Sequence, residues 1–339
     1  MTCCFVGKLY CALLMHITNF QTDRDNVHLF RSNRSLYESR RRYKVQKYVC
    51  WNQVKNITET GYHVFKMTID NEYNGGDSAT NRITYINTSF YFNRSISEGQ
   101  LSNHLTHLTL DHAFDQPLHH LPETLRFLIA RGELVKHPRL SGLPSTLEYL
   151  ELSGCFDHEL TGLPRSLKRL LLGNAFNQPI KALPPELTHF SVGDKFNQPL
   201  DGVFAACSFL NHLAFGKEFN QPLSRAVLPK NLLYLNLRFC EQFNYSIADF
   251  PTSLLHLDLG YNFTQSLAVL PPMLIDLHLS RYFNQKIGVP HTLERFSIDY
   301  FLIDIAHLVV TKRITVQPSV PNFGRCYWKP PALLFSQIY

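Results

Sequence analysis

Leucines recur along most of the chain in the pattern Leu-x-x-Leu-x-Leu, whose last positions alternate between apolar and outward-facing residues. In the clearest copy, Leu167, Leu170 and Leu172 are expected to point inward, while Lys168 and Arg169 face outward. Alternation with a period of two residues is typical of a short β-strand with one buried face. The pattern therefore predicts a series of short strands. Their inward positions are Leu105/Leu108/Leu110, Leu147/Leu150/Leu152, Leu187/Phe190/Val192, Leu210/Leu213/Phe215, Leu232/Leu235/Leu237, Leu254/Leu257/Leu259, Leu274/Leu277/Leu279 and Leu293/Phe296/Ile298.

A second pattern precedes these strands: a phenylalanine, an asparagine, a polar residue, a proline and a leucine or isoleucine. Clear copies begin at Phe176, Phe196 and Phe219. Weaker copies begin at Phe92, Phe114, Phe156, Phe243, Phe263 and Phe283. From Phe156 onward the phenylalanine spacings are 20, 20, 23, 24, 20 and 20 residues. A fixed period of this length indicates a solenoid, an architecture that builds binding surfaces far more often than active sites.

Each repeat is too short for a long helix, so the limb that returns from one strand to the next is expected to be extended or a single helical turn. Stacked repeats then form one parallel sheet of about ten strands, spaced roughly 4.8 Å apart. The phenylalanines would form an apolar spine inside the coil. The asparagine that follows each one would bond backbone groups of its own and the neighbouring turn.

These motifs resemble the FNIP repeat family, which is related to leucine-rich repeats. The resemblance covers residues 84–305 and rests on Phe-Asn-Gln-Pro-Leu/Ile, a following Leu-Pro, and the Leu-x-x-Leu-x-Leu strand. It departs from the pattern at 132–140, where the Phe-Asn pair is lost, and at Val203-Phe204, which replaces Leu-Pro. The resemblance implies a leucine-rich-repeat-like solenoid that binds another protein.

Residues 1–48 have a different composition, with a basic cluster at 40–42 and apolar residues at helical spacing. They are predicted to form a small helical module that resembles a divergent F-box, although the usual Leu-Pro at its start is missing. The resemblance implies that a Skp-type adaptor binds Leu13, Leu14, Ile17 and Leu29. Two alternatives stay open: a helical cap over the first strand of the solenoid, and a secretory signal, whose apolar core would be short.

The remaining segments are a linker and N-terminal cap at 49–83 and a proline-rich C-terminal cap, or docking tail, at 306–339. The net charge of +6 is small for 339 residues, which makes nucleic-acid binding unlikely, and no apolar run approaches membrane-spanning length. Of the Asn-x-Ser/Thr sequences, those at Asn93 and Asn244 are expected to be buried and closed to glycans. Cysteines without CxxC pairs also favour an intracellular protein, cytoplasmic or nuclear.

No catalytic motif is found, and neither an enzymatic activity nor a cofactor is expected.

The candidate partner-binding residues occupy the outward position at the start of successive strands: Arg169, His189, His212, Tyr234 and His256. Histidines on neighbouring strands would lie about 5 Å apart without a third ligand, which disfavours a metal site. Tyrosine and arginine are common binding anchors. Replacement of these residues is expected to cost little stability, and acidification towards pH 6 is expected to charge the histidines and alter binding.

Two functions follow from these expectations. In the first, the chain is a substrate receptor of a Skp/cullin/F-box ubiquitin ligase, in which the N-terminal module holds the adaptor and the repeats hold an unknown target protein. In the second, it is a repeat scaffold that binds a protein partner without any link to a ligase. A solvent-facing sheet with cross-strand stacking, and no partner, is the structural alternative for the outward column.

Overall fold

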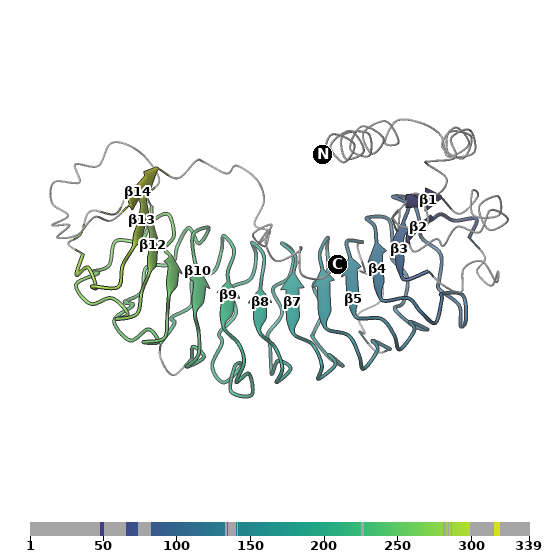
Figure 1. Ribbon diagram of the computed structural model, residues 1–339, viewed down its shortest axis with the longest axis horizontal. Helices are drawn as coiled ribbons and strands as arrows, with labels where there is room; N and C mark the ends of the chain where they lie inside the picture. The colour runs from purple at the N-terminus through teal and green to yellow at the C-terminus, as the bar shows by residue number, and fades with distance from the viewer. Residues whose placement is uncertain are drawn as a thin grey trace, which may run out of the picture.

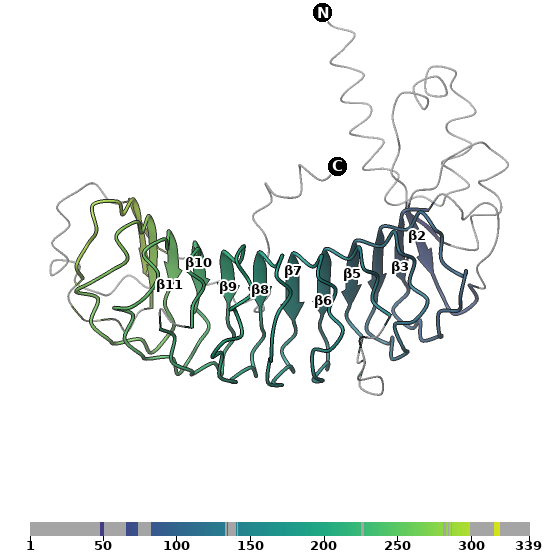
Figure 2. The same ribbon diagram turned by 90° about the horizontal axis from the view of Figure 1, so that it is seen from below.

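The computed structural model describes residues 48–50, 66–73, 83–298 and 315–318, except positions 133, 135–139, 141, 225–226, 281–282, 284 and 286. The described residues form one parallel sheet whose strands follow each other in chain order. Figure 1 shows the array as an arc, with the strands along its inner side and the connecting loops along its outer side. Seen from below, the strands lie side by side along the whole array (Figure 2). The predicted parallel solenoid is confirmed.

The sheet has 14 short strands, each of three or four residues. They are β1 (Tyr48–Cys50), β2 (Lys66–Ile69), β3 (Tyr85–Thr88), β4 (His107–Leu110), β5 (Phe127–Ala130), β6 (Tyr149–Leu152), β7 (Arg169–Leu172), β8 (His189–Ser191), β9 (His212–Ala214), β10 (Tyr234–Asn236), β11 (His256–Asp258), β12 (Asp276–Leu279), β13 (Arg295–Ile298) and β14 (Thr315–Pro318).

The sheet is longer than the ten or so strands expected from the repeats. Strands β1, β2 and β14 lie outside the predicted repeat span of 84–305, where the leucine pattern is absent. Parallel pairing needs only main-chain donors and acceptors, so a segment without the leucine pattern can still extend the sheet. Both end strands pair in parallel with their neighbours, β1 with β2 and β14 with β13.

Neighbouring strands pair in register, so equivalent residues of successive repeats lie next to each other. Leu150 pairs with Leu170, and Leu170 pairs with Phe190. These inward side chains are at most 1% exposed. The leucines of all the repeats therefore build one continuous core beneath the sheet.

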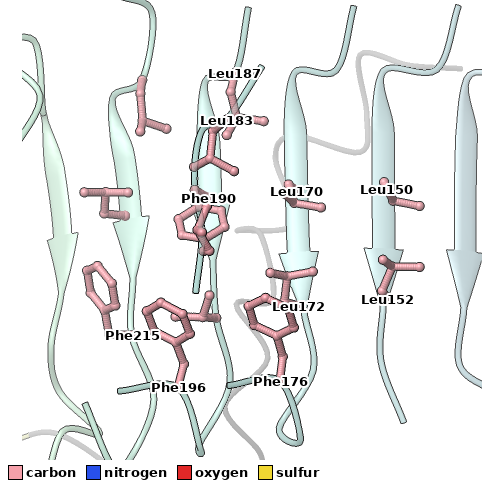
Figure 3. Packing of buried hydrophobic residues seen from close by; sticks show 14 of the residues in the cluster. Leu150, Leu152, Leu170, Leu172, Phe176, Leu183, Leu187, Phe190, Phe196 and Phe215 are labelled. Atoms are coloured by element: carbon pink, nitrogen blue, oxygen red, sulfur yellow. The ribbon is translucent and has the colours of Figure 1, made fainter. Parts of the chain in front are cut away.

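The phenylalanines form the expected spine inside the coil. Consecutive rings lie 5.9–6.5 Å apart from Phe156 to Phe283, and their planes are within 15° of parallel. Figure 3 shows Phe176 and Phe196 side by side in successive turns. The Phe-Asn pair is missing from the turn after β5, where Leu134 and Leu140 are buried instead. The spine thus supplies a large buried aromatic area in nearly every turn.

The asparagine after each phenylalanine connects one turn to the next. The Oδ1 atom of Asn177 accepts a hydrogen bond of 2.9 Å from the backbone N–H of Asn197. The Oδ1 atom of Asn197 accepts one from the N–H of Asn220, also 2.9 Å, and a second of 3.0 Å from Nε2 of Gln221. The expected hydrogen bonds from turn to turn are confirmed, and we call this series the asparagine ladder. It satisfies backbone donors that no strand partner reaches.

A second ladder, of hydroxyl groups, lies just before the strands and was not expected from the sequence. The hydroxyl of Ser166 donates to the carbonyl oxygens of Ser145 and Leu147, at 2.7 and 2.8 Å. Thr124, Ser253 and Thr292 make the same pair of contacts with their preceding turns. The single hydroxyl hydrogen of each side chain is therefore shared between two carbonyl groups where the chain enters the strand.

The turn that leaves each strand is packed closely against the preceding one. A Cβ atom at Gly193 would lie 2.5 Å from the backbone of Gly173 and Asn174, and a Cβ atom at Gly216 would lie 2.3 Å from the backbone of Gly193. Only glycine allows these backbones to approach so closely. The return limbs contain turns and extended segments, and no helix occurs among the described residues.

The predicted helical N-terminal module at residues 1–48 lies outside the described residues, apart from the first residue of β1.

The prediction that Asn93 and Asn244 are buried was wrong, because Asn93 is exposed and Asn244 is half-buried. Their side chains reach the adjacent turn from the surface of the coil: Asn93 Oδ1 accepts from Asp115 N, and Asn244 Oδ1 accepts from Thr264 N.

We predict that Asn197→Ala lowers the free energy of unfolding by about 1–2 kcal/mol, because it leaves the half-buried N–H of Asn220 without its acceptor. Asn197→Asp is the matched control, since Asp157 already fills this role and accepts from the N–H of Asn177 at 2.8 Å. Urea unfolding followed by circular dichroism measures the difference. Equal stability of the alanine variant and the wild type would show that the ladder contributes nothing.

Candidate functional site

The strand register brings the candidate partner-binding residues into one row on the inner side of the arc. Arg169 pairs with His189, His189 with His212, His212 with Tyr234, and Tyr234 with His256. Equivalent positions extend the row in both directions. The part of this row from β3 to β13, here called the inner column, is Tyr85, His107, Phe127, Tyr149, Arg169, His189, His212, Tyr234, His256, Asp276 and Arg295.

The rings of the inner column stack on one another across the strands. His107 lies 4.3 Å from Phe127 and His189 lies 4.1 Å from His212, measured between ring centroids, and both pairs are nearly parallel. His212 lies 5.5 Å from Tyr234, and Tyr234 lies 5.9 Å from His256. These side chains are consequently half-buried. The expectation that their replacement costs little stability stays a prediction, and the loss of these ring contacts would count against it.

Two of the three tyrosines of the inner column, Tyr149 and Tyr234, donate hydrogen bonds to acidic residues. The hydroxyl of Tyr149 donates to Glu151 Oε2 at 3.0 Å, and the hydroxyl of Tyr234 donates to Asp258 Oδ2 at 2.9 Å. Burial, reinforced by these carboxylates, raises the pKa of both phenols well above the usual value. Burial also raises the pKa of Asp258. Loss of the Tyr234 hydroxyl would therefore leave a buried acid without a hydrogen-bond donor.

The far end of the inner column is an ion cluster. Arg295 Nε lies 2.9 Å from Asp276 Oδ2, and His256 Nδ1 lies 3.6 Å from the same oxygen. Burial on its own would raise the pKa of Asp276, but the hydrogen bonds from His256 and Arg295 outweigh it and lower that pKa. The charges of Asp276 and Arg295 are thus paired with each other.

The central histidines are neutral at physiological pH. The pKa of His189 is lowered from 6.5 to about 3, mainly by burial and to a smaller extent by the neighbouring His212 and Arg169. The pKa of His212 is lowered to about 4, again mainly by burial and to a smaller extent by Arg169 and His256. The expectation that these two side chains gain charge near pH 6 was therefore wrong, since two stacked imidazoles beside an arginine resist protonation.

A shallow hollow opens in the middle of the inner face. It is lined by Leu171, His189, Phe190, Ser191, His212, Leu213, Ala214 and Tyr234. It exists because the second outward position of each strand is occupied by large residues at Leu171 and Asn236 but by small ones at Ser191 and Ala214 between them. Sequence reasoning missed this second row, although it follows from the same alternation two residues further along each strand.

The inner face offers aromatic, imidazole and guanidinium groups suited to binding. Among the described residues, no group of three or more His, Cys, Asp or Glu side chains could hold a metal ion. The same residues include no helix long and apolar enough to cross a membrane. The candidate adaptor-binding residues Leu13, Leu14, Ile17 and Leu29 lie outside the described residues.

Comparisons with known proteins agree with this architecture. The family described as FNIP Repeat matches residues 207–240, which hold strands β9 and β10. Among solved structures, CroV588, described as a novel circular leucine-rich-repeat protein, is 29% identical with a TM-score of 0.57. The match covers 75% of this chain but only 46% of CroV588. These two matches support the repeat family and a leucine-rich-repeat-like solenoid.

Two more distant structures were also found. An internalin from Listeria monocytogenes is 14% identical with a TM-score of 0.41, over 78% of this chain and 93% of the internalin. A leucine-rich-repeat protein from Bacteroides ovatus is 14% identical with a TM-score of 0.26, over 76% and 85% of the two chains. No curated protein matches the sequence.

We predict that the two central histidines make the protein less stable as the pH falls from about 6.5 towards 4. In this range the unfolded chain takes up protons at both side chains, whereas the folded chain does not, because both folded pKa values are lowered. Protonation therefore favours the unfolded state. Urea midpoints between pH 7 and pH 4 measure the effect.

The matched control is the double variant His189→Phe, His212→Phe, because Phe127 already stacks on His107 in the same column. Its stability should fall less steeply between pH 7 and pH 4 than that of the wild type. Identical slopes for the two proteins would show that the histidines titrate normally in the folded state.

Proposed function

We propose that this chain is a protein-interaction solenoid that binds a partner on the inner face of its sheet, through Arg169, His189, His212, Tyr234 and His256. The observation that carries the proposal is the inner column itself. It joins aromatic rings, imidazoles and an arginine into one unbroken row that reaches the surface of a concave sheet. Such residues dominate the binding energy of many protein interfaces.

The geometry of the inner face suits a protein partner better than a small metabolite. Its hollow is shallow and lies open on the sheet, whereas small-molecule sites enclose most of the ligand. The concave side of a solenoid offers a long surface on which many weak contacts can add up. Neighbouring rings also hold each other in place, so little side-chain entropy is lost when a partner binds.

The finer hypothesis is that the chain is a substrate receptor of a Skp/cullin/F-box ubiquitin ligase. It is motivated by the apolar spacing of Leu13, Leu14, Ile17 and Leu29 and by the resemblance to an F-box. In that role the chain would perform no chemistry itself and would raise the local concentration of its target near the ligase. A scaffold without a ligase link is the alternative, and adaptor binding separates the two.

We predict that Arg169→Ala and His256→Ala each weaken partner binding about tenfold or more, as expected for central anchors of an interface. The partner would first be captured with the full-length protein from cells that express it naturally, and its affinity for purified variants would then be measured by calorimetry. Lys181→Ala is the control, because this exposed side chain projects from the loop between β7 and β8. Unchanged affinity in both column variants would reject the inner face as the binding site.

For the N-terminal segment, we predict that the full-length protein co-purifies with the Skp-type adaptor of its own host. The double variant Leu14→Ala, Ile17→Ala should lose the adaptor while retaining the target, because both substitutions lie outside the repeats in the sequence. Lys8→Ala serves as a control outside the apolar set. If the wild-type protein captures its target without any adaptor, the chain is a scaffold.

A further inference from the structure

We infer that the inner face recognises an extended protein segment in which an acidic residue stands two positions from a large apolar one. In this proposal, which rests on the proposed function, the carboxylate pairs with Arg169 and the apolar side chain fills the hollow beside Leu171 and Ala214. The inference adds the chemistry of the partner to the binding surface already described.

Arg169 is the group on the inner face that most needs an anion. Within the described part of the chain, its half-buried guanidinium forms neither an ion pair nor a side-chain hydrogen bond. The other inner-column arginine, Arg295, is paired with Asp276. A guanidinium presents a fork of donors that matches a carboxylate, so an acidic side chain of a partner can supply the missing contact.

The groups around Arg169 leave its site open to an incoming anion. Tyr149 lies on one side and His189 on the other, and both side chains are neutral at pH 7. The nearest acid on the adjacent strand is Glu151. It accepts a hydrogen bond of 3.0 Å from the hydroxyl of Tyr149 and forms no ion pair with Arg169. No acidic residue of the described chain therefore competes for the guanidinium.

The hollow begins at Leu171, on the strand that also carries Arg169, and accepts an apolar group. Leu171 and Tyr234 lie at its two ends, and the small side chains of Ser191 and Ala214 leave its centre open. Its lining atoms are mostly apolar, and the stacked rings of His189 and His212 form part of its wall. A leucine-sized or aromatic side chain would bury apolar surface there that is now exposed to water.

The spacing of the two features fixes the spacing of the partner residues. Neighbouring strands lie about 4.8 Å apart, so the middle of the hollow, between β8 and β9, is roughly 7 Å from the strand that carries Arg169. In an extended segment, residues two positions apart are separated by about 6.6–7 Å and point to the same side. Measured across the strands, this separation matches a partner with one residue between its acidic and its apolar anchors.

The charges of the face also indicate a protein segment and not a nucleic acid. Glu151, Asp258 and Asp276 lie on the same face as Arg169. A phosphate backbone would place a negative charge opposite each of them, whereas nucleic-acid binding needs a continuous basic patch. A segment with a single acidic anchor avoids this repulsion.

Selection from a random peptide library displayed on phage, with the full-length protein as bait, tests the inference. The wild type should enrich peptides that read acidic-x-apolar. Arg169→Glu should instead enrich basic-x-apolar peptides, because the charge of the anchor is reversed. Ala214→Leu, which fills the hollow, should keep the acidic preference and lose the apolar one. Arg126→Glu is the control, since Arg126 already contacts Glu148 outside the inner column, and it should enrich the same peptides as the wild type.

Affinity measurements complete the test. For the best peptide, replacement of its acidic residue by Asn or Gln should weaken binding to the wild type about tenfold and have little effect on binding to Arg169→Glu. Circular dichroism confirms that each variant is folded. The inference would be overturned if the wild type and Arg169→Glu enriched the same peptides. It would also be overturned if the wild type enriched no peptide at all. Peptides that lack an acidic residue but require His212 would also overturn it, while leaving the proposed function intact.

Discussion

In-register stacking of the turns is the constraint on which the rest of this structure depends. Strands that pair in parallel lie about 4.8 Å apart, so the nearest neighbour of almost every side chain is its own equivalent one turn away. Each position of the repeat must therefore suit a column of similar residues. Stacked phenylalanines, asparagines that accept from the next turn, and glycines where backbones touch are the solutions found here. Each of these residues suits its own turn and also makes a contact with the next turn.

The same constraint shapes the inner face. Like charges stacked 4.8 Å apart would repel, so a column that carries charge must interrupt or pair it. Arg169 stands between a neutral tyrosine and a neutral histidine, and Asp276 stands between His256 and Arg295. Stacked histidines stay neutral because burial and their cationic neighbours oppose protonation. The face that results offers flat rings, an apolar hollow and an arginine, Arg169, that has no ion-pair partner among the residues that the structure describes, and these are the features of a protein-binding surface.

The repeat made much of this predictable from sequence. The Leu-x-x-Leu-x-Leu pattern predicted the strands and their inward residues, and the Phe-Asn motif predicted both the spine and the first ladder. The outward position of each strand correctly identified the row from Arg169 to His256, because alternation fixes which side chains share a face. The family match at residues 207–240 and the likeness to CroV588 support the same architecture.

What the sequence could not supply depended on distances between turns. The ladder of Ser166 and Thr292 is carried by side chains that look like ordinary turn residues until the preceding turn is placed beside them. The lowered pKa values of His189 and His212 arise from ring stacking and burial, neither of which is visible in a list of residues. The hollow arises from two small side chains on adjacent strands, and only the register reveals that they meet.

Deletion of one whole turn tests the stacking constraint most directly. Removal of residues 177–196 joins Phe176 to Asn197 and brings β7 beside β9 with every column still aligned. We expect this shortened protein to unfold cooperatively in urea, with a circular dichroism spectrum like that of the wild type. Removal of only 177–186 deletes half as many residues but breaks the columns, and it should abolish the cooperative transition. A cooperative transition in the half-turn deletion, or its loss in the whole-turn deletion, would contradict in-register stacking as the basis of the fold.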